Sequence, residues 1–147
     1  MRALIQRVSE AKVTIEGSIH GEIGQGILVL LGITHDDNSD DVSKLVHKII
    51  NLRVFSDSKG NMNISLLDIA GEILVISQFT LFANTKKGNR PSYIAAAKPQ
   101  QANLLYEAFI REMKEKVVKT ETGLFGADMK VHLINDGPVT ILLDTKN

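Results

Sequence analysis

Two short segments carry polar side chains whose positions suggest a site. The first is Ser77-Gln78-Phe79-Thr80, at the end of an apolar run that begins at Ile73. A buried strand is expected to stay apolar, and the ends of strands commonly form sites in α/β sheets. A half-exposed strand edge, where Thr is an ordinary residue, gives the same pattern. The residue types alone therefore leave a site and an edge as alternatives.

The second segment is Asn135-Asp136-Gly137-Pro138-Val139-Thr140. Gly followed by Pro is a turn signal, so the segment is also explained as a simple connection between two strands. Most bonds that precede proline are trans, and taken alone this favours a trans Gly137–Pro138 peptide.

The chemistry that these segments support stays open at the level of residue types. Ser77, Thr80 and Thr140 each carry a hydroxyl, but a hydroxyl nucleophile needs a neighbouring base. Only His132 lies near either segment in the sequence, and a dispersed triad cannot be recognised in one sequence. The four histidines form no pair at metal-ligand spacing and cysteine is absent, so we expect no metal and no cofactor.

The composition is that of a single globular domain covering residues 1–147, with 44% hydrophobic and 23% charged residues. No apolar run approaches the roughly 20 residues that cross a bilayer, and the first residues do not have the pattern of a signal peptide. With no cysteine, we expect an intracellular, cytoplasmic protein without a membrane partner. The 17 basic and 17 acidic residues give zero net charge, which argues against a protein that coats nucleic acid non-specifically.

The periodicity predicts an α/β domain with about seven or eight strands and two principal helices. The first helix is expected to begin at the polar group Asn38 to Asp41 and to bury Val42, Leu45 and Ile49. The second is expected to follow Pro99. We expect strands at 3–8, 13–15, 19–23, 27–33, 53–55, 73–82, 129–134 and 139–143, with the run 27–33 buried on both faces.

At the two polar segments the sequence closely resembles the D-aminoacyl-tRNA deacylase family, also known as the D-tyrosyl-tRNA deacylase family. The motifs are SQFTLFANTKKGNRPSY from Ser77 to Tyr93 and NDGPVTILLDT from Asn135 to Thr145. The similarity extends to the opening MRALIQRVSEAKVTIEG, to GILVLLGI and to GLFGADMKVHLINDGPVT. It covers essentially the whole chain, in the same order and with similar spacing.

The resemblance implies a compact single domain with a mixed or antiparallel barrel-like sheet, which forms a homodimer with its active sites at the interface. It implies hydrolysis of the ester bond between a D-amino acid, or glycine, and the 3′ end of tRNA. It also implies that Gly137–Pro138 is cis and enters the pocket of the other subunit. There its backbone leaves no room for an L side chain, which is a clash built against the wrong substrate.

The resemblance also assigns roles to residues. Ser77, Gln78, Phe79 and Thr80 match the catalytic segment, whose backbone N–H groups stabilise the ester carbonyl while the 2′-hydroxyl of the terminal adenosine assists hydrolysis. Phe125 and Met129 match positions near the adenosine and the Gly-Pro segment, and Arg7 matches the residue that braces this segment. By their charge and location, we expect the basic side chains of one loop to contact tRNA phosphates: Lys86, Lys87 and Arg90.

Two alternatives stay open beside this interpretation. One is a tRNA-binding module without turnover, against which the zero net charge argues. The other is a related deacylase of L-alanyl-tRNA, in which the Gly-Pro peptide is trans and the surrounding motif differs.

Overall fold

Eight strands, two α-helices and one short 3-10 helix make up the fold, and the computed structural model describes all residues from 1 to 147. The strands are β1 (Arg2–Ile15), β2 (Ser18–Ile23), β3 (Gly26–Gly32), β4 (Phe55–Ser56), β5 (Met62–Ile64), β6 (Glu72–Ser77), β7 (Thr120–Thr122) and β8 (Lys130–Asp144). The helices are α1 (Ser39–Asn51), the 3-10 helix η1 (Phe79–Phe82) and α2 (Pro99–Lys116). None of the helices combines the length and the apolar character needed to cross a membrane.

The main sheet is built around β1. The first half of β1 pairs with β3 and the second half with β2, while β8 runs along its other edge; all three pairings are antiparallel. Beyond β3 the sheet continues through β6 and β7 in parallel. The sheet curls until β2 approaches β7, where a Cβ on Gly21 would lie 3.2 Å from the carbonyl oxygen of Thr122. The expected barrel-like mixed sheet with two principal helices is therefore confirmed.

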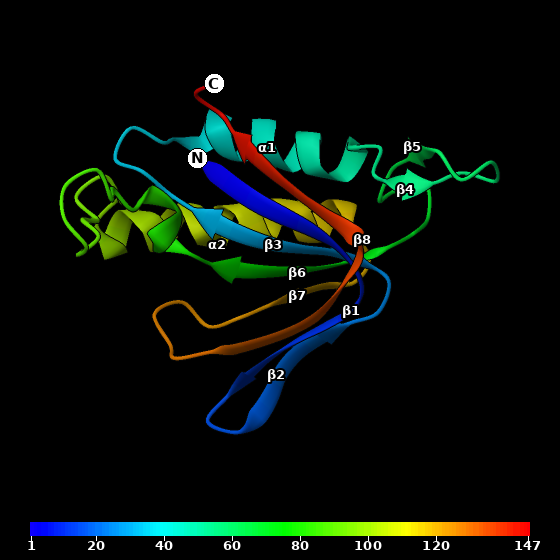
Figure 1. Ribbon diagram of the computed structural model, residues 1–147, viewed down its shortest axis with the longest axis horizontal. Helices are drawn as coiled ribbons and strands as arrows, with labels where there is room; N and C mark the ends of the chain where they lie inside the picture. Colours follow the sequence, from blue (N-terminus) through cyan, green and yellow to red (C-terminus); the bar gives the residue numbers. More distant parts are fainter.

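Both faces of the central strands are buried, as the apolar run 27–33 predicts. Along β3, Ile27, Val29 and Leu31 belong to the main core, which lies between the sheet and the two helices on one of its faces (Figure 1). Leu28 points to the other face, into a second core of seven buried residues inside the curled sheet. Burial on both faces explains why this strand shows no polar alternation.

The start of α1 follows the predicted capping pattern. The Asn38 side chain accepts hydrogen bonds from the N–H groups of Asp40 and Asp41, and the Asp41 carboxylate accepts one from the N–H of Asn38. This reciprocal capping box satisfies N–H groups that have no partner within the helix. The helix then buries Val42, Leu45 and Ile49, as expected.

The strand expected over 73–82 is wrong in its second half. β6 ends at Ser77, the N–H of Gln78 donates to the carbonyl of Leu31 at 2.8 Å, and the chain then turns into η1. The physical reason is the length of the neighbouring strands, because β3 ends at Gly32 and β7 has only three residues. With no strand left to pair with, the backbone forms bonds within a turn, such as Ala83 N–H to the Thr80 carbonyl.

Three smaller differences concern the other strands. The segments 129–134 and 139–143 form one strand, β8, interrupted by a bulge, because both pair with the same long β1. The short strand expected at 53–55 lies at Phe55–Ser56, where it pairs with β5. β7 was not predicted, because its three residues are too few to show a period.

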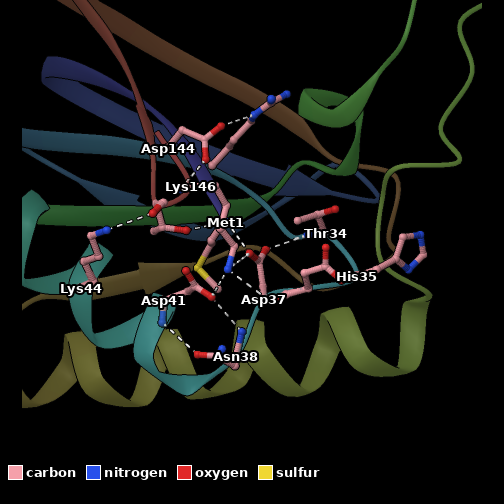
Figure 2. Close-up of polar contacts among 12 residues, drawn as sticks. Met1, Thr34, His35, Asp37, Asn38, Asp41, Lys44, Asp144 and Lys146 are labelled. Atoms are coloured by element: carbon pink, nitrogen blue, oxygen red, sulfur yellow. Dashed lines mark hydrogen bonds and ion pairs between the residues drawn. The ribbon is translucent and has the colours of Figure 1, made fainter.

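A polar cluster joins the start of β1 to the end of β8 and to the loop before α1 (Figure 2). The buried ammonium of Met1 donates to Asp37 Oδ1 at 2.5 Å and to Thr145 Oγ1 at 2.8 Å. Lys146 Nζ lies 2.9 Å from the Asp41 carboxylate. Burial alone would raise the pKa of Asp41, but hydrogen bonds from Thr145, Lys146 and Asn38 outweigh it and lower the pKa to about 2. The cluster ties the end of β8 to the start of α1.

Gly26 is required by the close approach of β3 to β6. A Cβ there would lie 1.8 Å from the carbonyl oxygen of Glu72, whereas a Cβ on Gly24 would meet nothing closer than a Glu72 carboxylate oxygen at 3.8 Å. We expect Gly26→Ala to lower the free energy of unfolding by at least about 2 kcal/mol, because backbone must move to admit the methyl group. Gly24→Ala should change it by less than about 0.5 kcal/mol. Urea unfolding measures both, and equal stability of the two variants would contradict this packing.

Candidate functional site: a pocket at the strand ends

A cavity of about 690 Å³ opens at the carboxyl ends of the parallel strands β3 and β6, the usual location of sites in α/β sheets. Twelve of its 18 lining residues are hydrophobic. The strands contribute Leu31 and Ile76, and the start of α2 contributes Ala102. An apolar cavity with a few polar groups at its edge is suited to a small organic group.

The first polar segment reaches this cavity. Ser77, Gln78 and Phe79 line it, and Phe79 is 55% exposed at its rim, with its ring 5.0 Å from that of Tyr93 in an edge-on arrangement. Thr80 does not line the cavity, but its hydroxyl accepts a hydrogen bond from the side-chain amide of Gln78. Gln78 and Phe79 lie beyond the end of β6, so they are not part of a strand edge.

Within one chain, no titratable side chain forms a hydrogen bond with the hydroxyl of Ser77 or Thr80. Asp128 lines the cavity but forms an ion pair with Lys130, and His132 belongs to β8, opposite Lys12 on β1. A Ser or Thr nucleophile needs such a partner. The first N–H groups of a helical turn have no acceptor within the turn, and no side chain caps η1. The segment thus offers backbone N–H donors beside the cavity.

Phe125 and Met129 form another wall of the cavity. The Phe125 ring lies 5.8 Å from that of Tyr106, whose hydroxyl donates to the Val75 carbonyl at 3.1 Å. Burial raises the pKa of Tyr106, so this phenol stays protonated. Met129 passes close to Gly123, where a Cβ would lie 2.5 Å from its sulfur. Both predicted side chains are therefore held by the core around them.

Sequence reasoning missed the segment that closes the cavity between Tyr93 and Pro99. The Thr34 hydroxyl donates to the Ala95 carbonyl at 2.6 Å, and His35 Nε2 lies 2.7 Å from the Ile94 carbonyl oxygen. The usable signal was the run Ala95-Ala96-Ala97, because small side chains before a helix leave room for a cavity.

The second polar segment lies elsewhere in the chain, at a bulge in β8. Gln6 pairs with Thr140 but Val8 pairs with Asn135, so β1 advances by two residues while β8 advances by five. The extra residues form an exposed loop that contains Gly137 and Pro138. Their peptide bond is cis, as the resemblance implied and against the expectation from proline statistics.

Arg7 holds this bulge. Its Nε donates to the Asp136 carbonyl at 2.9 Å and its NH1 to the Val54 carbonyl at 2.7 Å. Arg7 pairs with Ile27, four residues before Leu31 on β3, which places the bulge roughly 13 Å along the strand from the cavity. Within one chain, the structure therefore does not bring Arg7, Gly137 or Pro138 to the cavity.

Lys86, Lys87 and Arg90 lie on an exposed loop. Asn84 and Ser92 close its base through two backbone hydrogen bonds of 2.8 and 2.9 Å, next to Tyr93 at the cavity rim. The loop that carries these three cations therefore begins and ends beside the cavity.

The fold and the pocket define a class: a barrel-like α/β domain with an apolar cavity at the strand ends, backbone donors beside it and no nucleophile–base pair. Residues 4–144 match the family described as D-Tyr-tRNA(Tyr) deacylase. The chain belongs to this family and is therefore an enzyme that acts on the ester bond of aminoacyl-tRNA.

Full-length relatives agree. A D-aminoacyl-tRNA deacylase of Bacillus velezensis is 56% identical over 99% of both chains. One of Fusobacterium nucleatum is 58% identical over 100% of this chain and 97% of its own. Among solved structures, a c-Myc DNA Unwinding Element Binding Protein superposes with a TM-score of 0.94 at 42% identity over 99% of both chains. A probable eukaryotic D-amino acid tRNA deacylase shares the fold, with a TM-score of 0.81 at 14% identity over 97% of both chains.

A substitution that fills the cavity should reduce deacylation without unfolding the protein. Ala96 lines the cavity, whereas its neighbour Ala95 is exposed outside it. We expect Ala96→Phe to lower kcat/KM for deacylation at least about tenfold, because the new ring occupies space that the substrate needs. The matched variant Ala95→Phe should keep near-normal kcat/KM. Steady-state kinetics on charged tRNA test this, and equal activity of the two variants would place the site elsewhere.

Proposed function

We propose that this enzyme hydrolyses the ester bond between D-amino acids, or glycine, and the 3′-terminal adenosine of tRNA, and that it spares L-aminoacyl-tRNA. The observation that carries the proposal is the apolar cavity bordered by the Ser77 to Phe79 segment, with no base beside any hydroxyl. Because its substrate is aminoacyl-tRNA, we place the enzyme in the cytoplasm.

In this proposal the protein contributes position and electrostatics to the reaction. Backbone N–H groups at the start of η1 stabilise the negative charge that develops on the ester carbonyl oxygen. The 2′-hydroxyl of the terminal adenosine assists the attack, so no side chain has to act as nucleophile. The hydrogen bond from Gln78 to Thr80 keeps the turn in place, which makes Thr80 a site residue through its position. Phe125 and Met129 contact the adenosine.

We propose further that the active unit is a homodimer in which the Gly137–Pro138 segment of the partner subunit completes each cavity. Three observations support it: the bulge is exposed, it lies away from its own cavity, and β8 pairs with no strand besides β1. Ile134 and Leu142 of β8 are 54% and 56% exposed, which suits an interface. A twofold axis would place each bulge at the other subunit's cavity.

Chiral selection then follows from exclusion. Carbonyl oxygens of the inserted segment hold the substrate's amino group and occupy the space that an L side chain would need. A D side chain points away from this wall, and glycine has no side chain to collide with it. Such a pocket rejects one configuration without recognising the identity of the side chain.

The two alternatives make different demands on the molecule. A binding module without turnover has no need for an enclosed apolar cavity, since phosphate contacts supply its affinity. A deacylase of L-alanyl-tRNA needs space where the proposed wall stands. Nothing in the pocket favours either over the D-specific reaction.

The direct test charges one tRNA with D-tyrosine, L-tyrosine or glycine and follows release of each label by the purified protein. We expect rapid loss of the D-tyrosyl and glycyl esters and at least about a hundredfold slower loss of the L-tyrosyl ester, because a steric clash of several kcal/mol separates them. Ala96→Phe serves as the inactive control. If the wild-type protein hydrolyses none of the esters, the enzyme proposal is refuted. If it hydrolyses the D-tyrosyl and L-tyrosyl esters equally fast, the proposed chiral wall does not exclude L side chains.

Mixing two inactive variants tests the shared site. Arg7→Ala releases the bulge and Ala96→Phe blocks the cavity, so each variant alone should be inactive if both elements are needed. In hybrid dimers the open cavity of the Arg7→Ala chain meets the intact bulge of the Ala96→Phe chain. Random mixing after mild dissociation should therefore restore roughly a quarter of wild-type activity, since half of the dimers are hybrids with one intact site. No restoration, although hybrids form, would show that each site is built from one chain.

A further inference from the structure

A second large cavity, of about 900 Å³, forms a groove between α1 and the last part of β8. In Figure 1 the end of β8 crosses α1 at an angle. The lining of the groove includes Leu142, which the homodimer proposal places at the interface, so the groove borders that interface. The cations of its lining are Arg2, Lys44, Lys48 and Arg53, joined by His47, and its one acidic side chain is Asp144. In a chain with zero net charge, this is a local concentration of positive charge that the bulk composition conceals.

Part of this charge is available to a ligand. The Asp144 carboxylate is occupied by Arg2, whose Nε lies 2.8 Å from Oδ2. Lys48 has no ion pair or hydrogen bond within the chain, and Lys44 Nζ donates one bond, to the Thr145 carbonyl at 3.0 Å. Arg53 uses only its Nε, which donates to the Asn63 carbonyl at 3.0 Å. Apart from the paired Asp144, no Asp or Glu side chain lines the groove. Outside the lining, hydrogen bonds from Ser65 and the charge of Arg53 lower the pKa of Asp68, so Arg53 has a carboxylate nearby.

The groove begins near the active-site cavity. Arg2 pairs with Gly32 at the carboxyl end of β3, and its NH1 donates to the Leu81 carbonyl of η1 at 3.0 Å. Its guanidinium also lies 4.5 Å from the centre of the Phe82 ring. From Arg2 the lining continues to Lys44 and Lys48, which are one helical turn apart on α1, and then to Arg53 beyond the end of the helix. The row of cations therefore leads away from η1.

We propose that this groove binds the phosphate backbone of the acceptor arm of the aminoacyl-tRNA whose 3′ end occupies the cavity. The inference rests on the function proposed above, because it takes the polyanion from that substrate. Lysine and arginine contacts to phosphates supply affinity and position without reading bases. This suits an enzyme that must accept any tRNA carrying the wrong amino acid.

Phosphate contacts that are equally strong in the ground state and the transition state lower KM and leave kcat unchanged. Removing these contacts should lower kcat/KM for aminoacyl-tRNA and leave kcat/KM unchanged for a substrate without an acceptor arm. The double variant Lys48→Glu/Arg53→Glu tests this, since neither residue lines the active-site cavity. The matched control is Arg111→Glu/Lys114→Glu, which makes the same charge change at exposed positions of α2.

Each protein is assayed on D-tyrosyl-tRNA and on 3′-O-D-tyrosyl-adenosine. We expect the groove variant to lose at least about tenfold in kcat/KM on the tRNA, through KM, and to show a salt dependence of log KM that is shallower by about two. Its kcat/KM on the adenosine ester should stay within about twofold of wild type. The control variant should resemble wild type on both substrates.

Three outcomes would overturn the proposal: equal loss on both substrates, no loss on the tRNA, or a change of oligomeric state in the groove variant by size-exclusion chromatography. If wild-type protein hydrolyses neither substrate, the proposed function fails separately. Filter binding of uncharged tRNA then tests the groove proposal by itself. Weaker binding by the groove variant than by the control variant supports the proposal, and equal binding refutes it.

Discussion

The pairing of β1 with β8 is the constraint on which the rest of the structure depends. β1 already bonds to β3 and then β2 along one edge, so β8 can pair only along the other edge. The extra residues of β8 cannot be absorbed into this ladder and must leave it as a bulge. That bulge carries Gly137 and Pro138 to the surface. Arg7 of the same β1 holds the bulge, because its Nε donates to the Asp136 carbonyl and its NH1 donates to the Val54 carbonyl. One strand pair thus determines where the proposed chiral wall lies.

The cavity arises from a different constraint, the unequal lengths of neighbouring strands. β6 stops at Ser77 because β3 and β7 offer it no further partner, and the chain has to satisfy its backbone in the short turn η1. A turn leaves its first N–H groups without acceptors, whereas a continued strand would have used them. The donors that we propose for ester chemistry are therefore a consequence of where pairing ends.

How much of this could be predicted from the sequence depends on the range of the interactions. The cap of α1 involves Asn38 and Asp41 only, so local residue types were sufficient to predict it. The end of β6 depends on where β3 ends, about 45 residues before it in the chain, and apolar character continues through Phe82, so the strand was predicted too long. Ser77, Gln78, Phe79, Phe125 and Met129 were assigned by resemblance, and the structure brings them to one cavity. The alanines that close it were missed because small apolar residues carry no functional group, and only their run before Pro99 was a signal.

The distribution of charge over the surface also could not be predicted from the sequence. Zero net charge argued against non-specific coating of nucleic acid, and that argument concerns the whole surface. It says nothing of where cations gather, because Lys44, Lys48 and Arg53 become neighbours of Arg2 only once α1 lies beside β8. An enzyme that corrects tRNA charging has two separate tasks: it binds the tRNA, which all its substrates share, and it distinguishes the two configurations at the α-carbon of the amino acid. In the proposals made above, a groove of cations and an apolar cavity divide these tasks between two surfaces, so we expect that affinity for tRNA can change without any change in chiral preference.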